Sequence, residues 1–322
     1  MTATAVSATE LRKTYPGDVT ALDGLSFSVG RGEIFGMLGP NGAGKSTTIR
    51  ILTTLSRPDS GRATVAGADV LSSPDEVRHR IGVVAQGSGV DPVATGRENL
   101  TLQGRVHGMS GQALRRRVDE LLDRFRLAKA ADRPARTYSG GMQRRLDIAL
   151  GMIHSPQVLF LDEPTTGLDP EVRADMWEMI RQLVSEDGLT VVLTTHYMDE
   201  ADRLADRVAI VDGGRVVAEG TPEGLKADLE GDAVHIELAG DEAADRARDI
   251  LTELTANGTQ VDGQTVRARV RGGAEAVPRI LTTLDGAAIG VRSVTVSRPS
   301  LDDVYFRHTG RSLAGAEEGE EQ

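Results

Sequence analysis

Residues 39–47 read GPNGAGKST. The stretch satisfies the phosphate-loop pattern G-x-x-x-x-G-K-[ST] at Gly39, Gly44, Lys45 and Ser46. The apolar run before it, EIFGML, is typical of a buried strand, and KSTTIRILTTL after it is typical of a helix. A strand that enters a helix through a glycine-rich turn points backbone N–H groups and the positive helix end at a phosphate. The context therefore predicts a phosphate-binding loop.

Composition excludes several other kinds of site. The chain has 322 residues, 39% of them hydrophobic, which suits one large domain and a smaller one. There is no cysteine, so disulfides and thiolate metal sites are excluded, and the six histidines lack the spacing of zinc ligands. A net charge of −11 and an aromatic content of 3% lack the basic footprint and stacking surface of nucleic-acid binding. We expect no nucleic-acid partner.

The sequence also bears on location. No apolar run approaches the roughly 18 residues that a membrane helix requires. The first residues, MTATAVSATELRKTY, lack the charged-then-apolar order of a secretory signal. We therefore expect a cytoplasmic protein, with any membrane role depending on a partner.

Over the first 228 residues, strand-like apolar runs alternate with helical patterns. Strands are expected at residues 34–38, 81–86, 158–162, 190–196 and 207–220, the last with a hairpin turn at 212–214. The stretch LRRRVDELLDRF, residues 114–125, carries apolar residues at helical spacing. Alternation of this kind predicts an α/β domain, residues 1–228, with a mainly parallel sheet covered on both faces.

Residues 231–310 follow a different order. A strand over 233–238, a helix over 241–254, a hairpin about residues 262–263, a helix over 275–284 and a strand over 291–296 give β-α-β-β-α-β. This order resembles the split ferredoxin-like motif and predicts a small α+β accessory domain. A short helix, LDDVYFRH, then ends at Gly310. Residues 311–322 are small and acidic, and we expect a disordered tail.

Further candidates follow the phosphate loop in a fixed order. Residues 138–145 read YSGGMQRR, residues 158–164 read VLFLDEP, and residues 167–170 read GLDP. Gln86 and His196 each end a predicted strand, and Tyr15 precedes the loop. Each feature alone is ordinary, since an Asp-Glu pair after a strand is usually solvated and a lone histidine is usually structural. Together, in this order, they resemble the nucleotide-binding subunit of an ATP-binding cassette (ABC) transporter over roughly the first 225 residues.

The chemistry of the loop is direct. The backbone N–H groups of residues 41–45 can surround the phosphates of ATP, and Lys45 offers a point charge to the β- and γ-phosphates. The Ser46 hydroxyl and the Asp162 carboxylate can hold Mg²⁺, which keeps most of its waters. Thr47 can reach the α-phosphate, and the resemblance implies that Glu163 activates the attacking water. The nucleotide-binding residues expected within the loop are Gly39, Asn41, Gly42, Ala43, Gly44, Lys45, Ser46 and Thr47.

The resemblance implies a shared site between two chains. Ser139, Gly140 and Gly141 would form the signature turn, which faces ATP held by the other subunit. The usual LSGGQ is altered, because Tyr138 replaces leucine and Met142 replaces glutamine. By the same resemblance Tyr15 stacks on adenine, Gln86 contacts Mg²⁺ or the water, His196 contacts the γ-phosphate, and Asp169 reaches across the dimer. One set of residues per chain predicts an ATP-sandwich homodimer.

The last third of the chain indicates which group of ABC transporter subunits the sequence resembles. The stretch VAEGTPEGLKADL, a small α/β domain and then SLDDVYFRHTGRSL resemble the daunorubicin/doxorubicin-resistance (DrrA-type) exporter ATPases, and RENL at residues 97–100 fits the same group. The resemblance implies an ATPase that powers efflux of a drug, antibiotic or other hydrophobic compound. It also implies a separate multispanning permease, docked near the stretch after Gln86, and a peripheral position on the inner face of the cell membrane.

Other readings stay open. The chain could serve a lipid or glycan transporter, an importer, or a non-transport role, and the small domain could bind a regulator. A chromosome-maintenance ATPase is disfavoured, because no heptad run separates Lys45 from Ser139. A ribosome-binding factor would carry two cassettes, and this chain has one.

Overall fold

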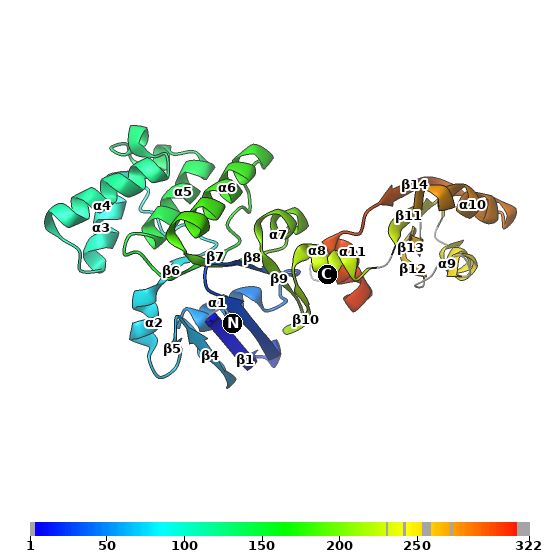
Figure 1. The fold of residues 1–322 in the computed structure, drawn as a ribbon, viewed down its shortest axis with the longest axis horizontal. Coiled ribbons are helices and arrows are strands. Elements are labelled where there is room, and N and C mark those ends of the chain that lie inside the picture. The colour runs from blue at the N-terminus through cyan, green and yellow to red at the C-terminus, as the bar shows by residue number, and fades with distance from the viewer. Residues whose placement is uncertain (1–3, 230, 241–242, 253–258, 271–272, 314–322) are drawn as a thin grey trace. The chain divides into compact units, whose positions relative to one another are not determined.

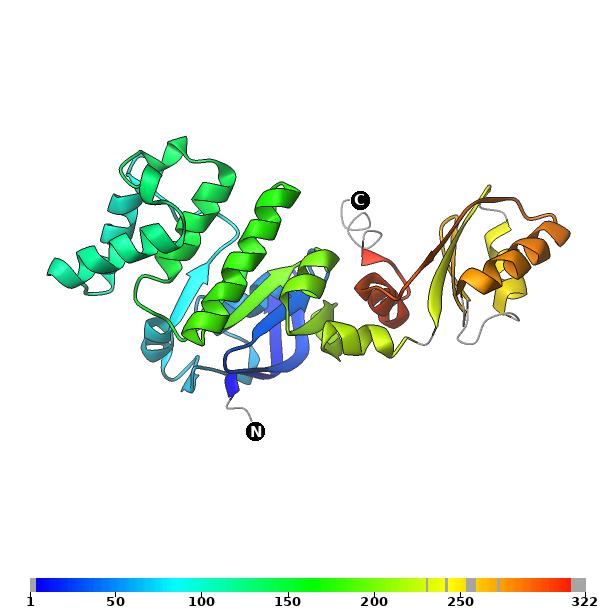
Figure 2. The same cartoon turned by 45° about the horizontal axis from the view of Figure 1, so that its top comes forward.

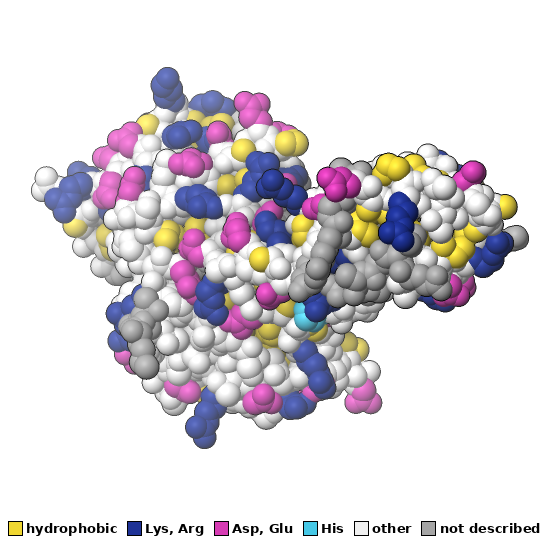
Figure 3. Space-filling model, turned by 45° about the vertical axis from the view of Figure 1, so that its right-hand side comes forward, with side chains coloured by type: hydrophobic (Ala, Val, Ile, Leu, Met, Phe, Trp, Pro, Cys, Tyr) yellow, Lys and Arg dark blue, Asp and Glu magenta, His cyan; other side chains and the backbone are white. Residues whose placement is uncertain are grey.

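The computed structural model describes residues 4–229, 231–240, 243–252, 259–270 and 273–313. The chain forms two compact units, Met1–Val217 and Ala218–Gln322 (Figure 1). Each unit has a sheet and a core of its own. In the view of Figure 3, acidic and basic side chains are interspersed over the larger unit, where local ion pairs such as Arg124 with Asp187 at 2.7 Å are common.

A six-stranded sheet, in the order β10-β9-β3-β8-β7-β6, forms the centre of the first unit. Its strands are β3 Ile34–Leu38, β6 Ile81–Val84, β7 Val158–Asp162, β8 Thr190–Thr195, β9 Arg207–Asp212 and β10 Arg215–Gly220. Neighbours from β6 to β9 pair in parallel, and the positive φ of Gly213 (54°) and Gly214 (74°) suits the tight turn before β10. The predicted mainly parallel sheet is confirmed.

Both faces of this sheet are buried. Along β7, Leu159 and Leu161 belong to one hydrophobic cluster, while Val158 and Phe160 belong to another on the opposite face. Successive side chains of a strand point to opposite faces, so a continuous apolar run is what a doubly covered strand requires. This is why VLFLD reads as an unbroken apolar stretch.

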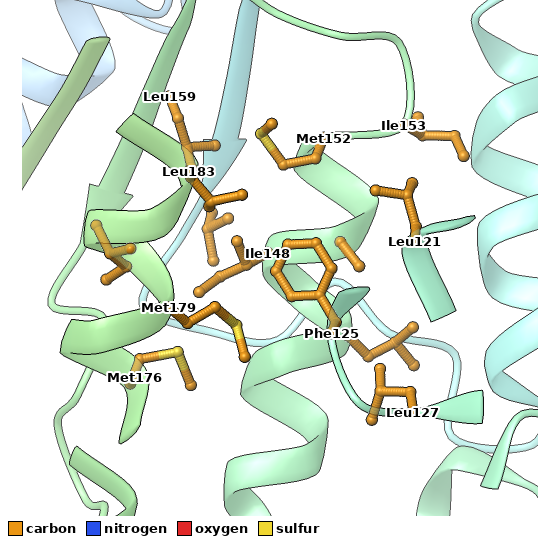
Figure 4. Close-up of a cluster of buried hydrophobic side chains, with 14 of the residues drawn as sticks. Leu121, Phe125, Leu127, Ile148, Met152, Ile153, Leu159, Met176, Met179 and Leu183 are labelled. Carbon is orange, nitrogen blue, oxygen red and sulfur yellow. The ribbon is translucent and has the colours of Figure 1, made fainter. Parts of the chain in front are cut away.

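Helices pack on both faces of the parallel sheet. In Figure 1, α5 (Gly140–Gly151) and α6 (Pro170–Asp187) lie on one side of the strands β6, β7 and β8, and α1 (Lys45–Leu52) lies on the other. Figure 2 shows α6 lying along the sheet, and Figure 4 shows Phe125 and Leu121 meeting Ile148 and Met179 in the core beneath α5 and α6. The helices are α1 Lys45–Leu52, α2 Pro74–Arg80, α3 Gly96–Val106, α4 Gly111–Arg124, α5 Gly140–Gly151, α6 Pro170–Asp187 and α7 Met198–Leu204.

A second, four-stranded sheet covers the other face, and sequence analysis did not anticipate it. It has the order β2-β1-β4-β5, with β1 Thr4–Tyr15, β2 Val19–Gly30, β4 Ser60–Val65 and β5 Ala68–Asp69. All of its pairings are antiparallel. The pairing of β1 with β2 carries several register shifts, and each such irregularity breaks the period-two pattern that reveals a strand. Leu11 and Leu25 of this sheet share a core with Phe35 of the parallel sheet.

The second unit has the predicted β-α-β-β-α-β order. Its strands β11 Asp232–Leu238, β12 Thr259–Asp262, β13 Thr265–Val270 and β14 Val291–Ser297 form an antiparallel sheet in the order β12-β13-β11-β14. Helices α9 Ala244–Thr252 and α10 Gly273–Gly286 contribute Leu251 and Ile280 to a core shared with Ile236. This is the split arrangement expected from the sequence.

Two further helices complete this unit. Helix α8, Pro222–Ala227, is followed by Asp228, whose carbonyl accepts a hydrogen bond of 2.9 Å from Arg307 of α11, Leu301–Thr309. Helix α11 ends at Gly310, whose φ of 76° is the left-handed stop expected there. Of the predicted tail, residues 314–322 lie outside the described residues, while Leu313 is buried and its N–H donates to Asp302.

Candidate active site

The phosphate loop joins β3 to α1, and its shape depends on two glycines. Gly44 has a φ of 102°, and a Cβ there would lie 2.4 Å from the carbonyl oxygen of Ala21. A Cβ on Gly39 would lie 2.2 Å from the carbonyl oxygen of Val211. Both approaches are closer than real side chains tolerate, so the loop can keep this path only with glycine at these positions.

Lys45 lies inside the loop. The residue is 4% exposed, and its Nζ donates hydrogen bonds of 2.7 Å to the carbonyl oxygens of Gly39 and Pro40. The loop thus holds the ammonium at the N-terminal end of α1, where backbone N–H groups are free of helical partners. A cation beside free N–H donors fits a polyphosphate.

Two oxygen ligands meet next to the loop. The Ser46 hydroxyl donates to Oδ1 of Asp162 at 3.1 Å, and Thr194 donates to the same oxygen at 2.6 Å. These residues come from α1, β7 and β8, and β7 and β8 are neighbours in the sheet. One hydroxyl beside one carboxylate fits Mg²⁺ that is also bound to phosphate, because this ion takes few protein ligands.

Glu163 follows Asp162 in the chain, and several of the predicted site residues lie against its carboxylate. Its Oε2 accepts from Nε2 of Gln86 at 3.2 Å and from the Thr166 hydroxyl at 3.1 Å. Its Oε1 lies 3.4 Å from Nδ1 of His196. Glu163 has a φ of 48°, a conformation that a residue other than glycine rarely adopts. Gln86 and His196 therefore share one carboxylate.

The charge of Glu163 is stabilised by these neighbours. The hydrogen bond with His196 lowers the pKa of Glu163 most, burial opposes that shift, and the charges of His196 and Lys45 lower the pKa further. The carboxylate is consequently ionised at neutral pH. An ionised carboxylate beside a phosphate loop can orient a water molecule and accept its proton.

Tyr15 lies at the end of β1 and faces the first turns beyond the phosphate loop. A hydrogen bond with the Thr47 side chain lowers the pKa of Tyr15 most, with smaller contributions from Ser56 and Arg50. The ammonium of Lys13 stands 5.6 Å from the ring centroid. The structure thus brings Tyr15 and Thr47 together.

The turn at Ser139, Gly140 and Gly141 begins α5. The Ser139 hydroxyl accepts a hydrogen bond from the N–H of Met142 at 3.3 Å, which caps the helix. A Cβ on Gly141 would lie 2.5 Å from Val172 of α6, whereas Gly140 is exposed and meets only Leu168, at 3.7 Å. Met142 is half-buried and packs against the hydrophobic core under the helices.

Asp169 begins α6 beside this turn. Its Oδ1 accepts from the N–H of Val172 at 3.0 Å, so the side chain caps its own helix. The turn at Ser139 and the loop ending at Asp169 are neighbours within one chain. The remaining expected site residues, Asn41, Gly42 and Ala43, lie in the phosphate loop, with Ala43 buried and the other two exposed.

Sequence analysis missed two residues of α5 that hold the site together. Arg144 is 8% exposed and donates to the carbonyl oxygens of Ala85, Asp162, Glu163 and Pro164 at 2.8 to 3.2 Å. Its pKa is lowered, because burial disfavours the charged guanidinium.

One turn later, Asp147 extends the same support. Its Oδ1 accepts from the Ser88 hydroxyl at 3.1 Å and from the N–H of Gly89 at 2.9 Å. Helix α5 thus links the turn at Ser139 to the loop after Gln86 and to Glu163. The only sequence signal for this role is the position of both residues just after the signature turn.

Comparisons with known proteins agree with this geometry. Residues 22–166 match the family model described as ABC transporter, and residues 220–309 match that of the DrrA1-3-like ATP-binding protein C-terminal domain.

The chain is 46% identical to the daunorubicin resistance ATP-binding protein DrrA2 of Streptomyces coeruleorubidus, covering 97% of each. It is 47% identical to the daunorubicin/doxorubicin resistance ATP-binding protein DrrA of Streptomyces peucetius, covering 95% of this chain and 92% of that one. It is 42% identical to the Nod factor export ATP-binding protein I of Ralstonia nicotianae, covering 96% and 94%.

Solved structures show the same fold. One is cbiO1 from Clostridium perfringens, part of the ABC transporter complex cbiONQ, with a TM-score of 0.64 and 30% identity, covering 70% of this chain and 91% of that one. Another is the dimeric post-hydrolysis state of the cassette MJ0796 bound to ADP and Pi, with a TM-score of 0.61 and 29% identity, covering 67% and 98%. Among the described residues, every helix falls short of the length and apolarity needed to cross a membrane. The chain therefore belongs to the ABC transporter family of ATP-binding proteins, and it is an ATPase.

Proposed function

We propose that this ATPase powers an exporter by hydrolysing MgATP as a homodimer bound to a separate membrane permease. The observation that carries the proposal is the meeting of Gln86 and His196 on Glu163, beside the Ser46–Asp162 pair. The relatives named for drug resistance and for Nod factor export support export over import.

In this mechanism the phosphate loop binds and orients ATP. Lys45 would turn from its loop carbonyls to the β- and γ-phosphates, and Ser46 and Asp162 would hold Mg²⁺. Magnesium, when bound, supplies positive charge to the phosphates. Glu163 orients the attacking water and accepts its proton, Gln86 and His196 fix the carboxylate, and His196 also contacts the γ-phosphate. Tyr15 contacts the adenine.

The homodimer completes each site. The turn at Ser139, Gly140 and Gly141 of one chain faces ATP held by the other, where the N-terminus of α5 favours a phosphate. Asp169 reaches across the seam. ATP binds the closed dimer more tightly than the open one, and hydrolysis reopens it, so the alternation of the two states drives the permease.

A groove next to Gln86 offers a surface for the permease. Its volume is about 390 Å³, and its lining includes Val83, Gly87 and His154. Leu55 at 72% exposure stands at this groove, and Leu102 and Val106 stand on the exposed face of α3 nearby. Exposed apolar side chains around a concave surface favour an amphipathic helix as the partner. Docking there would place the subunit peripherally on the inner face of the membrane.

The exported compound is not specified by this subunit. A drug, an antibiotic or another hydrophobic compound is the first candidate, and a lipid or glycan is the alternative that the Nod factor export relative favours. Substrate contacts would lie in the permease.

Affinity purification from detergent-solubilised membranes tests the proposal. The tagged wild-type chain and a Lys45→Ala variant should both retain a multispanning permease, because Lys45 lies in the loop and not in the groove. A Leu102→Glu, Val106→Glu variant should lose the permease while keeping its ATPase activity. Recovery of no membrane-spanning protein with the wild-type chain would contradict the transport role.

A further inference from the structure

A buried carboxylate joins three elements behind the proposed site. Glu200 of α7 is 0% exposed, and its Oε1 accepts hydrogen bonds from the Thr165 hydroxyl at 2.7 Å and from Nε1 of Trp177 at 2.9 Å. Thr165 lies in the loop after β7, and Trp177 lies in α6. One oxygen thus gathers donors from two other segments.

The segments that Glu200 joins carry one residue proposed to contact ATP and one proposed to contact the partner chain. Thr165 is two residues after Glu163, and its carbonyl accepts from the N–H of Leu168, next to Asp169. Glu200 lies in the first turn of α7, four residues after His196. A break in this network would therefore loosen the connection between the Asp169 loop and the His196 segment.

A second contact ties the same two segments together. Arg173, whose N–H donates to the carbonyl of Asp169 at 2.9 Å, places its guanidinium 4.4 Å from the centroid of the Tyr197 ring. The same guanidinium lies 3.6 Å from Asp199. The start of α6 and the start of α7 are consequently held at two places.

Burying a carboxyl group at this position is costly. Burial raises the pKa of Glu200, while hydrogen bonds from Thr195, Thr165 and Trp177 lower it. An apolar residue of similar size would avoid the desolvation penalty, but it could not hold two donors in fixed directions. Glutamate at this position therefore fixes the directions of two hydrogen bonds at a cost in folding stability.

We propose that Glu200 is a positioning residue that couples the γ-phosphate contact of His196 to the dimer contact of Asp169. The inference rests on the proposed function, because His196 and Asp169 have their roles there. Glu200 touches neither nucleotide nor metal. Its effect is to make the two segments move as one.

The chain contains its own reporter for this network. Trp177 is the only tryptophan, and its indole N–H is one of the two donors to Glu200. Indole fluorescence responds to hydrogen bonding and local polarity. Binding of MgATP to a Glu163→Gln protein in which Thr165 and Glu200 are unchanged should therefore change the fluorescence emission of Trp177.

The test compares Thr165→Val with Thr165→Ser, because serine keeps the hydroxyl donor. Thr165→Val should lower kcat by about tenfold or more while KM for ATP stays within about twofold, since misplaced groups cost rate and not ground-state binding. It should also abolish the MgATP-dependent fluorescence change in the Glu163→Gln background. Thr165→Ser should restore both. Glu200→Gln, which keeps one acceptor oxygen, should behave like the serine variant.

Equal kcat and equal fluorescence response in Thr165→Val and the wild type would overturn the coupling role. Equal losses of kcat in Thr165→Val and Thr165→Ser would overturn it too, because the hydroxyl would then be irrelevant. Failure of the proposed function is distinct: the Glu163→Gln chain would stay monomeric with MgATP, and the wild-type chain would retain no permease.

Discussion

The Ser46 hydroxyl donates a hydrogen bond of 3.1 Å to Asp162, although the two residues are 116 positions apart in the chain. Strands β3 and β7 both pair in parallel with β8, so their carboxyl ends meet at one edge of the sheet. Ligands of open α/β sheets bind at that edge. The parallel pairing therefore explains how the phosphate loop and the carboxylate proposed to hold Mg²⁺ come together.

Replacing Lys45 by alanine should lower ATPase activity by roughly a hundredfold or more, because the loop loses its charge for the developing phosphoryl anion. The hydrogen bonds of the side chain to Gly39 and Pro40 lie within the loop itself, so far-UV circular dichroism should stay native. Lys129→Ala, at an exposed site, is the matched control and should keep full activity. Turnover by the Lys45 variant at the wild-type rate would refute the role.

The two glycines of the signature turn should respond differently to alanine. Gly141→Ala places a Cβ 2.5 Å from Val172, and such overpacking costs about 1–3 kcal/mol of stability. Gly140→Ala meets nothing closer than 3.7 Å and should unfold at the wild-type temperature, but its methyl group should weaken ATP-dependent dimerisation. Thermal unfolding and light scattering measure the two effects. Equal melting temperatures for both variants would contradict the packing argument.

Much of this fold was predictable from local pattern. The bounds of β3 and β7 match the apolar runs IFGML and VLFLD, because both faces of those strands are buried. The antiparallel sheet was not predictable in the same way, since bulges interrupt the alternation along β1 and β2. A strand that is regular only in short pieces leaves no long periodic signal.

The residues of the candidate site were likewise predictable only in part. Lys45, Asp162 and Glu163 stand within motifs whose spacing reveals them. Arg144 and Glu200 act through partners far away in sequence, the carbonyl of Ala85 in one case and Trp177 in the other. Helical position alone does not reveal whether such a side chain faces water or a buried acceptor, so these residues required the structure.

Arg144→Met should lower both stability and activity. Methionine fills much of the same volume but removes the donor that four backbone carbonyls share, which costs roughly 3 kcal/mol. Urea denaturation measures that loss, and kcat should fall because Glu163 and the loop before Gln86 share the donor. Arg145→Met, which removes a partly exposed ion pair with Asp175 at 3.2 Å, should cost less than about 1 kcal/mol. Equal losses in the two variants would contradict the bridging role.

His154 should make stability depend on pH. Burial lowers its pKa to about 4, with the neighbouring His107 ring stacked at 3.8 Å and further repulsion from His79 and Arg117. The unfolded chain binds this proton near pH 6.5, so it holds more protons than the folded chain between that pH and about 4. Stability must therefore fall as pH drops through this window.

The size of the effect is about 1 kcal/mol once solvent screening of the half-buried ring is included. Urea denaturation at pH 7 and pH 5 should show a smaller loss on acidification in His154→Gln than in the wild type. His308→Gln, at an exposed helix end, should lose as much as the wild type. An unchanged loss in His154→Gln would exclude this residue as the source.

Light scattering of a Glu163→Gln protein tests the central claim most directly. Glutamine keeps the shape of the side chain but cannot accept the proton of the attacking water, so bound ATP should persist and hold two chains together. With saturating MgATP the molar mass should double from the 34.3 kDa of one chain. A mass that stays at one chain while the nucleotide is bound would contradict the shared ATP site.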